Sequence, residues 1–256
     1  MDLINIIILT KNEEKFIGGL LENLKELNLP ITIVDSFSED NTIKIAEKYN
    51  VKVVQNKFET FSKQRNYAIE ISESEWVLFV DADERLNAEL VKFIDDFPQY
   101  LTTNSNSALA IPRKTIAFGK ELRYTWKTNE IRLLKKKDCS YDETIKVHER
   151  VIVNGSIGVA PNGYMLHYTY TDFEQYLKKM NFYIELESKN ELNKRVSLIS
   201  ILLTPIYKFL HRLFVKRWLL DGMAGIHAAY TTLIVNFLTL SLTRSKQREG
   251  DLYGKE

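Results

Sequence analysis

Cysteine is nearly absent from the sequence, which contains only Cys139 among 256 residues. An intrachain disulfide is therefore impossible, and this fits a protein of a reducing compartment. An excess of charge of either sign is absent too, because 35 Lys and Arg residues face 34 Asp and Glu residues. Such a balance excludes the globally basic class of nucleic-acid-binding proteins, so we expect no nucleic-acid partner.

Repeats, low-complexity tracts and a signal peptide are also missing from the sequence. Residues 1–5 carry no positive charge, and the apolar run at 6–9 is too short for the hydrophobic part of a signal peptide. We therefore expect the protein to stay on the cytoplasmic side of any membrane that it meets. The hydrophobic fraction of 45% and the charged fraction of 27% are those of a globular protein.

The first 100 residues alternate between apolar, β-branched runs and segments in which apolar residues recur at helical spacing. We expect strands at 3–10, 31–34, 51–54 and 75–80, and helices at 16–27, 42–49, 61–71 and 88–95. This alternation predicts an α/β fold, with a mainly parallel sheet flanked by helices on both faces.

Polar clusters follow three of these strands, at residues 10–14, 35–40 and 81–84. Ligands of open α/β sheets bind beyond the carboxyl ends of the strands, so the three clusters predict a nucleotide site there. Asp81 and Asp83 stand two residues apart directly after a buried strand. Carboxylates in this arrangement suit Mg²⁺ or Mn²⁺, which keep open positions for phosphate oxygens.

The middle of the chain predicts an irregular, partly antiparallel layer at the edge of the parallel sheet. Its expected strands are short and lie at 108–112, 130–134 and 150–153, and a helix is expected over 172–193.

The last quarter of the chain is basic and apolar. Residues 194–220 hold six cations and no acidic residue, and aromatic and aliphatic residues stand between the cations. Such a helical extension is typical of a segment that lies on an anionic membrane surface. Residues 223–242 carry no formal charge and are long enough to span a bilayer. Polar residues such as His227 and Asn236 favour the surface position, and a spanning helix is the alternative.

Four motifs occur in a specific order within the first 100 residues. They are Ile-Leu-Thr-Lys-Asn-Glu-Glu (8–14), Val-Asp-Ser-Phe-Ser-Glu-Asp-Asn-Thr (34–42), Gln-Arg-Asn-Tyr-Ala (64–68) and Phe-Val-Asp-Ala-Asp-Glu (79–84). Together they resemble the family 2 glycosyltransferases. The resemblance implies a GT-A fold, a UDP-sugar donor, a divalent cation (Mg²⁺ or Mn²⁺) and transfer of the sugar with inversion.

The rest of the chain resembles the lipopolysaccharide core β-1,4-glucosyltransferases through three further motifs. They are Val-His-Glu-Arg (147–150), Leu-His-Tyr (166–168) and Asp221-Gly222. This resemblance implies transfer of glucose from UDP-glucose to a lipid-linked oligosaccharide, the inner-core heptose of lipopolysaccharide or lipooligosaccharide. It also implies a location at the cytoplasmic face of the inner membrane. The alternatives are a polyprenyl phosphate, capsule glycan or protein acceptor, or a nucleotide-sugar-binding protein without transferase activity.

The resemblance to the family also assigns residues to the donor site. Thr10, Glu14 and Asp35 would line the nucleoside pocket, where Asp35 would accept a hydrogen bond from uracil. Arg65 would pair with the donor phosphate or ribose, and Asp81 would contact the ribose and the water shell of the metal. The structural alternatives are a helix cap for Asp35 and a solvated helix charge for Arg65.

Asp83 and His167 would ligate the metal, and Glu149 would act as the catalytic base. Glu143 and Asp142 compete with Glu149 for that role, and a half-buried structural histidine is the alternative for His167. A carboxylate base is needed because the acceptor hydroxyl is a poor nucleophile.

On this basis we expect three regions along the chain. Residues 1–100 form the nucleotide-sugar-binding half of the GT-A domain, and residues 101–193 form its acceptor-side half. Residues 194–256 form the helical region that associates with the membrane.

Overall fold

The computed structural model describes residues 2–117, 119–125, 128–144, 150–169, 195–253 and four residue pairs between 176 and 188, with side chains up to residue 248. The chain divides into two compact units. The first comprises Met1–Lys114 and Thr128–His167, and the second comprises Thr115–Lys127 and Tyr168–Glu256.

The strands and helices of the first 101 residues are, in order, β1 (Ile4–Thr10), α1 (Ile17–Leu24), η1 (Lys25–Leu27), β2 (Ile31–Asp35), α2 (Thr42–Ala46), β3 (Lys52–Gln55), α3 (Phe61–Ile71), β4 (Trp76–Phe79), β5 (Glu84–Leu86), α4 (Ala88–Asp95) and α5 (Phe97–Leu101). They alternate as expected up to β4, and β5 and α5 are additional elements. The remaining elements up to residue 169 are β6 (Ala108–Ala117), β7 (Lys120–Leu122), β8 (Thr128–Lys135), η2 (Lys136–Asp138), β9 (Cys139–Tyr141), β10 (Val151–Val153), β11 (Ile157–Val159) and β12 (Met165–Thr169).

One sheet dominates the described part of the first unit. Its strand order is β3-β2-β1-β4-β8-β6-β12-β5, with β11 also paired to β6. The end of β6 from Thr115 pairs with β7, and both of these segments belong to the second unit. The neighbours β3, β2, β1 and β4 run parallel, whereas β8 pairs antiparallel with both β4 and β6. The expected mainly parallel sheet is therefore confirmed, and an antiparallel part extends it.

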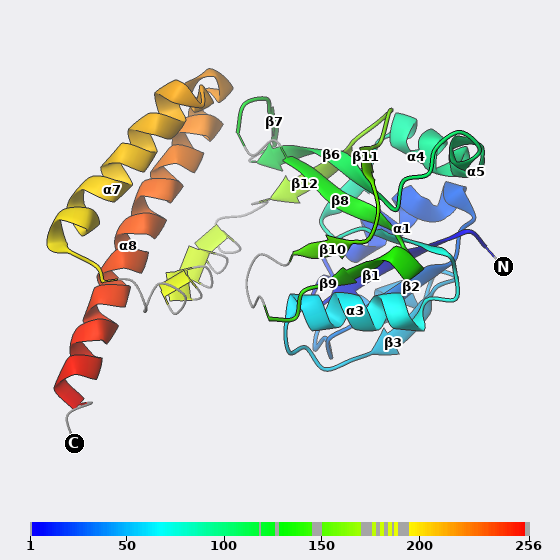
Figure 1. Ribbon diagram of the computed structural model, residues 1–256, viewed down its shortest axis with the longest axis horizontal. Helices are drawn as coiled ribbons and strands as arrows, with labels where there is room; N and C mark the ends of the chain where they lie inside the picture. Colours follow the sequence, from blue (N-terminus) through cyan, green and yellow to red (C-terminus); the bar gives the residue numbers. More distant parts are fainter. Residues whose placement is uncertain are drawn as a thin grey trace. The chain divides into compact units, whose positions relative to one another are not determined.

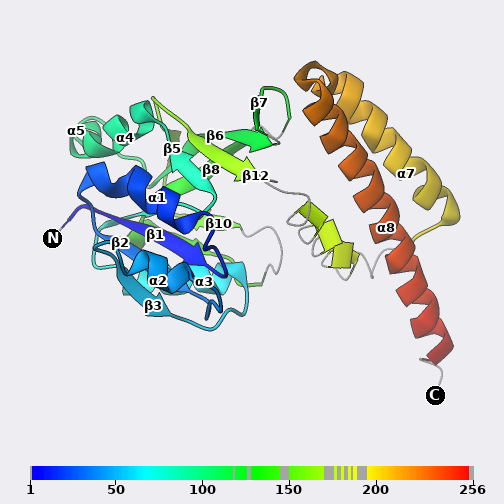
Figure 2. The same cartoon turned by 180° about the vertical axis from the view of Figure 1, so that it is seen from behind.

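Side chains of β1 and β4 alternate between two hydrophobic layers, because successive residues of a strand face opposite sides of a sheet. Ile6 and Leu78 pack in the layer that α1 covers, and Ile7 and Phe79 pack in the layer of α3. Helices α1 and α2 lie on one face of the sheet and α3 lies on the other (Figures 1 and 2). The near-continuous apolar sequence of β1 follows from this burial on both faces.

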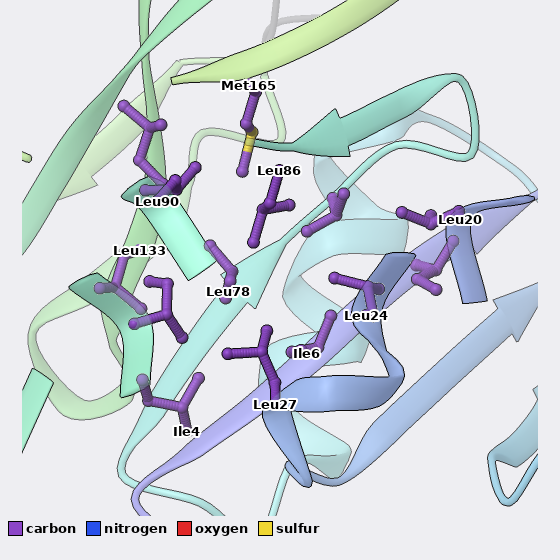
Figure 3. Close-up of a cluster of buried hydrophobic side chains, with 14 of the residues drawn as sticks. Ile4, Ile6, Leu20, Leu24, Leu27, Leu78, Leu86, Leu90, Leu133 and Met165 are labelled. Atoms are coloured by element: carbon purple, nitrogen blue, oxygen red, sulfur yellow. The ribbon is translucent and has the colours of Figure 1, made fainter. Parts of the chain in front are cut away.

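The larger layer joins the parallel and antiparallel parts of the sheet. Figure 3 shows Ile4 and Ile6 of β1 together with Leu133 of β8 and Met165 of β12 in one cluster. All four side chains are at most 2% exposed. Strand β12, far along the sequence, is therefore held by the same core as the first strand.

The middle of the chain contains more strands than the sequence indicates. Strands at 108–112, 130–134 and 150–153 are confirmed, although the first two extend to Ala117 and from Thr128 to Lys135. Strands β5, β7, β9, β11 and β12 are additional. The helix expected over 172–193 falls mostly outside the described residues.

The second unit contains two long helices. They are α7 (Leu198–Leu210), which continues through η4 (His211–Val215), and α8 (Met223–Tyr253); the turn η5 (Trp218–Asp221) joins them. The two helices lie side by side (Figure 1). The Ser197 hydroxyl accepts the backbone N–H of Ser200 and thus caps the start of α7.

Helix α7 exposes most of its apolar residues. Ile201 and Pro205 are its buried residues, whereas Ile199, Leu202 and Leu203 are each more than 60% exposed. Among the described helices, Leu198–Val215 and Met223–Arg248 are long and apolar enough to cross a membrane, with mean hydropathies of 1.5 and 1.3. The expected basic and apolar helical extension is confirmed.

Asp221 anchors the segment that follows β7 to the turn between α7 and α8. The Asp221 carboxylate is buried and accepts hydrogen bonds from the backbone N–H groups of Arg123, Tyr124 and Thr125 at 2.8–3.0 Å. It also accepts a bond of 2.7 Å from the Thr125 hydroxyl. The Asp-Gly dipeptide noted in the sequence is thus a structural anchor for residues 123–125.

Substitution of Asp221 by alanine is expected to release this segment. The three amides lose their common acceptor, so their hydrogen exchange should accelerate by at least about tenfold, since a hydrogen bond to a charged group contributes about 1.5–3 kcal/mol. Hydrogen-exchange mass spectrometry measures this. Asp221→Asn retains one acceptor oxygen and should give an intermediate rate. Unchanged exchange in Asp221→Ala would show that other contacts hold the segment.

Candidate active site

Thr10 and Asp35 end two neighbouring parallel strands and are paired in the register of β1 and β2. The Thr10 hydroxyl donates to the Asp35 carboxylate at 2.9 Å, and the backbone N–H of Ser38 donates to the same carboxylate at 2.8 Å. Asp35 is fully buried. Its hydrogen bonds order the loop after β2, and none of those described caps α2.

The loops after β1 and β2 are joined to each other. Glu14 accepts hydrogen bonds from the backbone and the side chain of Asn41, at 3.1 and 2.9 Å. Asp40 accepts the backbone N–H groups of Glu14 and Thr42. Glu14 therefore fixes the rim of the expected nucleoside pocket through its carboxylate. Phe37, in the same rim, is 51% exposed and has a positive φ of 59°, a conformation that costs energy in a residue with a Cβ.

The three residues 64–66 of α3 each connect to a different element. Gln64 donates to the Ser36 hydroxyl at the end of β2, at 3.1 Å. Arg65 lies 3.4 Å from the Asp81 carboxylate and places its guanidinium over the Phe79 ring, 4.8 Å from the ring centre. Asn66 exchanges hydrogen bonds with the backbone of Tyr141 in β9. Arg65 is buried, so the structure differs from the alternative of a solvated helix charge.

Asp81, whose side chain is 35% exposed, belongs to an ion network with the buried residues Arg132 and Glu84. Arg132 of β8 donates to Asp81 at 2.6 Å and to Glu84 at 2.9 Å. Glu84 also accepts the backbone N–H of Asp81 at 3.0 Å. Arg113 of β6 lies 3.8 Å from Glu84. The end of β4 is thereby connected to the antiparallel strands.

The charges of this network determine the protonation states. Burial alone would raise the pKa of Asp81, but the positive charges of Arg132 and Arg65 hold it well below the ordinary range. Burial raises the pKa of Glu84 despite the attraction of Arg132. Burial alone would lower the pKa of the Arg132 guanidinium. The negative charges of Asp81 and Glu84 outweigh this effect and raise the pKa above its ordinary value. Asp81 is therefore an anion at neutral pH.

Asp83 and His167 lie next to each other, although 84 positions separate them in the sequence. The Asp83 carboxylate is 3.4 Å from the His167 imidazole Nε2, and both side chains are mostly buried. Strand pairing brings them together, because His167 of β12 is the register partner of Glu84 of β5. The pair offers one oxygen and one nitrogen ligand to the same cation.

No group of three or more His, Cys, Asp or Glu side chains within the described ranges could hold a metal ion by itself. A cation at Asp83 and His167 therefore requires further oxygens, such as those of a diphosphate or water.

The catalytic-base candidate Glu149 lies outside the described residues. Both competing carboxylates are described and make hydrogen bonds. Asp142 accepts from the backbone and hydroxyl of Thr144, which lowers the pKa of its carboxyl. Glu143 accepts from the Asn66 side chain at 2.8 Å.

Arg132, Glu84 and Arg113 are site residues that the sequence interpretation missed. One signal was available: Arg132 interrupts the apolar run 131–134 at a position that the expected strand buries. A buried arginine requires an acidic partner. The sequence pattern does not identify that partner, because Asp81 and Glu84 lie about 50 residues away.

A family model described as glycosyl transferase family 2 matches residues 5–152. A glycosyltransferase of Rickettsia bellii, named as uncharacterized, is 30% identical over 94% of this chain and 86% of its own length. The lipopolysaccharide core biosynthesis glycosyltransferase LpsC of Rhizobium meliloti is 26% identical over 91% of this chain and 88% of its own length. The resemblance to lipopolysaccharide core enzymes is thereby confirmed.

Solved structures extend the likeness to the whole fold. The crystal structure of S. aureus TarS 1-349 in complex with UDP is similar at a TM-score of 0.51 and 18% identity. The match covers 97% of this chain and 92% of that chain. The expected GT-A fold is confirmed. The family match over more than half of the sequence shows that the chain belongs to glycosyl transferase family 2 and is a glycosyltransferase.

Proposed function

We propose that this enzyme transfers glucose from UDP-glucose, with inversion, to the inner-core heptose of a lipopolysaccharide or lipooligosaccharide. The observation that carries the proposal is the juxtaposition of Asp83 and His167, beside the ion network of Asp81 in the same unit. TarS was crystallised with UDP, and LpsC is named for lipopolysaccharide core biosynthesis. Both names support a nucleotide-sugar donor and a glycolipid acceptor for this chain.

The donor nucleoside is proposed to bind at the ends of β1 and β2. Asp35 is held by Thr10 and Ser38, so a carboxylate is fixed in position before the ligand arrives. We assign it to the uracil ring, with Thr10 and Glu14 at the pocket rim. Arg65 and Asp81 are assigned to the ribose and the diphosphate.

The residues present fit a divalent cation. Asp83 supplies a carboxylate oxygen and His167 an imidazole nitrogen, and their separation of 3.4 Å allows both to contact one ion. The nitrogen ligand favours Mn²⁺ over Mg²⁺, because Mg²⁺ prefers oxygen. When bound, the cation neutralises charge on the departing diphosphate.

The reaction is proposed as a single displacement. The acceptor hydroxyl oxygen bonds to the anomeric carbon while the bond from that carbon to the UDP oxygen breaks. Glu149 takes the hydroxyl proton, and UDP leaves with the bonding electrons. Because no protein group attacks the sugar, the anomeric configuration inverts.

Replacement of Asp35 by alanine is expected to weaken UDP binding at least about tenfold, since it removes a fixed charged acceptor. Isothermal titration calorimetry measures the affinity. Glu39→Ala changes an exposed carboxylate of the same loop and should leave the affinity unchanged. UDP binding of wild-type strength in a folded Asp35→Ala protein would remove Asp35 from the donor site.

The second unit is proposed to lie on the cytoplasmic face of the inner membrane. Exposed apolar side chains recur along α7 and its continuation, and these are Leu198, Ile199, Leu202, Leu203, Ile206, Tyr207, Leu210, Phe214 and Val215. Lys208, Lys216 and Arg217 are exposed on the same segment. Apolar residues with cations suit an anionic lipid surface, where a lipid-linked acceptor also resides.

The double substitution Leu202→Glu and Ile206→Glu is expected to lower binding to anionic phospholipid vesicles at least about tenfold, because each buried aliphatic side chain contributes about 1.5–3 kcal/mol. Vesicle sedimentation measures the bound fraction. Val159→Glu, at an exposed apolar residue of the first unit, is the matched control. Equal binding of the double variant and the wild type would exclude α7 as the membrane contact.

A donor panel tests the proposed function. The full chain is incubated with UDP-, GDP- and TDP-hexoses, including UDP-glucose and UDP-N-acetylglucosamine, with and without Mn²⁺. We expect slow metal-dependent release of UDP from UDP-glucose alone. Hydrolysis of another sugar nucleotide would identify that compound, and not UDP-glucose, as the donor. Absence of binding to every member would favour the alternative of a different ligand on the same fold.

A further inference from the structure

A cavity of about 850 Å³ in the first unit adjoins Asp81 and contains residues that the proposed donor site does not use. Four arginines line it, and these are Arg65, Arg113, Arg132 and Arg150. Asp81 and Glu130 are its acidic lining residues. The four arginines therefore outnumber the two carboxylates that line the cavity.

The arginines differ in how far their hydrogen-bonding groups are used. Arg132 is engaged at short distance by two carboxylates. Arg113 has only long ion pairs, at 3.8 Å to Glu84 and 3.5 Å to Glu130. Its Nε atom is buried and has no hydrogen-bond partner among the described residues, as is also true of Arg132 Nε and Arg65 Nη1. An unsatisfied buried donor is unfavourable, and a bound acceptor group would remove that cost.

Arg150 adds a second available guanidinium. It is exposed, and its charge acts on the Asp142 carboxylate, whose pKa it helps to lower. Guanidinium groups bind phosphate and carboxylate through paired N–H donors. Arg113, which has only long ion pairs, and the exposed Arg150 therefore provide the cavity with donors of the type that anions require.

The cavity lies on the acceptor side of the proposed reaction. Arg113 lies in β6, and Arg150 directly precedes β10. Thr10 and Asp35, by contrast, end β1 and β2. Because the nucleoside is proposed to bind at Thr10 and Asp35, an anion held in this cavity is assigned to the acceptor.

We propose that this cavity binds an anionic substituent, a phosphate or carboxylate, on the acceptor saccharide through Arg113 and Arg150. The enzyme then selects a phosphorylated or acidic glycan over its neutral counterpart. This inference rests on the proposed function, since it takes the donor to bind at Thr10 and Asp35.

The test uses the full chain with UDP and Mn²⁺ at saturation, at constant ionic strength. Glycerol phosphate and glycerate are the anionic probes, and glycerol is the neutral control. Calorimetry should show saturable binding of at least one anion and none of glycerol. Arg113→Gln and Arg150→Gln should each weaken anion binding at least about tenfold, and Arg150→Gln should leave UDP affinity within twofold. Lys137→Gln, at a cation outside the cavity, should change neither.

Three results would overturn the inference. They are no anion binding in the presence of UDP, competition between UDP and the anion, and unchanged anion binding in both arginine variants. Competition would assign the arginines to the donor diphosphate. Arg150 is exposed, so its variant should fold even if Arg113→Gln does not. If wild-type protein fails to bind UDP, the proposed function fails, and the anion titration without UDP still reports on the cavity.

Discussion

Substitution of Asp83 by asparagine is expected to lower kcat/KM for sugar transfer by about three orders of magnitude. The variant loses the charged ligand of the proposed cation, and metal-ion stabilisation of a leaving group contributes several kcal/mol, with each 1.36 kcal/mol equal to a factor of ten. The Asp83 carboxylate lies 3.4 Å from His167, so His167→Asn should act in the same direction. Release of UDP from UDP-glucose measures both variants.

The matched control is Asp95→Asn, which changes an exposed carboxylate in the last turn of α4. Its activity should equal that of the wild type. The unfolding midpoint of Asp83→Asn should stay close to that of the wild type, so that the activity loss is not a loss of fold. A folded Asp83→Asn enzyme with wild-type kcat/KM would remove Asp83 from the metal site.

Substitution of Arg132 by methionine is expected to lower the free energy of unfolding by about 3–5 kcal/mol. Methionine leaves the Asp81 and Glu84 carboxylates without their shared partner, and Glu84 is fully buried. An uncompensated buried charge costs much more than the lost attraction alone. Urea denaturation followed by circular dichroism measures the change.

Two further variants separate charge from packing in this network. Lys135→Met removes a cation of the same strand whose partner Glu75 is half exposed, and it should cost at most about 1 kcal/mol. Glu84→Gln in the Arg132→Met background should recover part of the loss, because it removes one unpaired charge. If Arg132→Met is as stable as Lys135→Met, the network does not stabilise the fold in the manner described.

The parallel part of the fold was predictable from the sequence because its pattern is local. Helices α3 and α4 begin and end at the residues where apolar spacing begins and ends. Strand β1 is buried on both faces, so its sequence is almost entirely apolar. These signals depend on neighbours within a few residues, and periodicity detects them.

The antiparallel part was only partly predictable because its strands are short and pair over long distances. Strand β5 has three residues, and its partner β12 lies about 80 positions later. Neither segment has enough residues to show a period. The resemblance to the family assigned Asp83 and His167 to one site, and the pairing of β5 with β12 explains how the backbone brings them together.

The arginine network was missed for a related reason. Arg132 pairs with Asp81, which follows β4. Arg132 and Arg113 both lie near Glu84 of β5, so the partners of these arginines are far away in the sequence. The apolar run around Arg132 indicates a buried arginine but does not identify its partner. The strand order shows which carboxylates the two arginines meet.

A count of bound Mn²⁺ by electron paramagnetic resonance, with and without UDP, tests the proposed metal site most directly. We expect one tightly bound Mn²⁺ per chain when UDP is present. Binding without UDP should be much weaker, because Asp83 and His167 supply only two ligands. Asp83→Asn and His167→Asn should each abolish the tight site. Tight Mn²⁺ binding that both variants retain, or no Mn²⁺ binding with UDP, would show that Asp83 and His167 do not hold the metal.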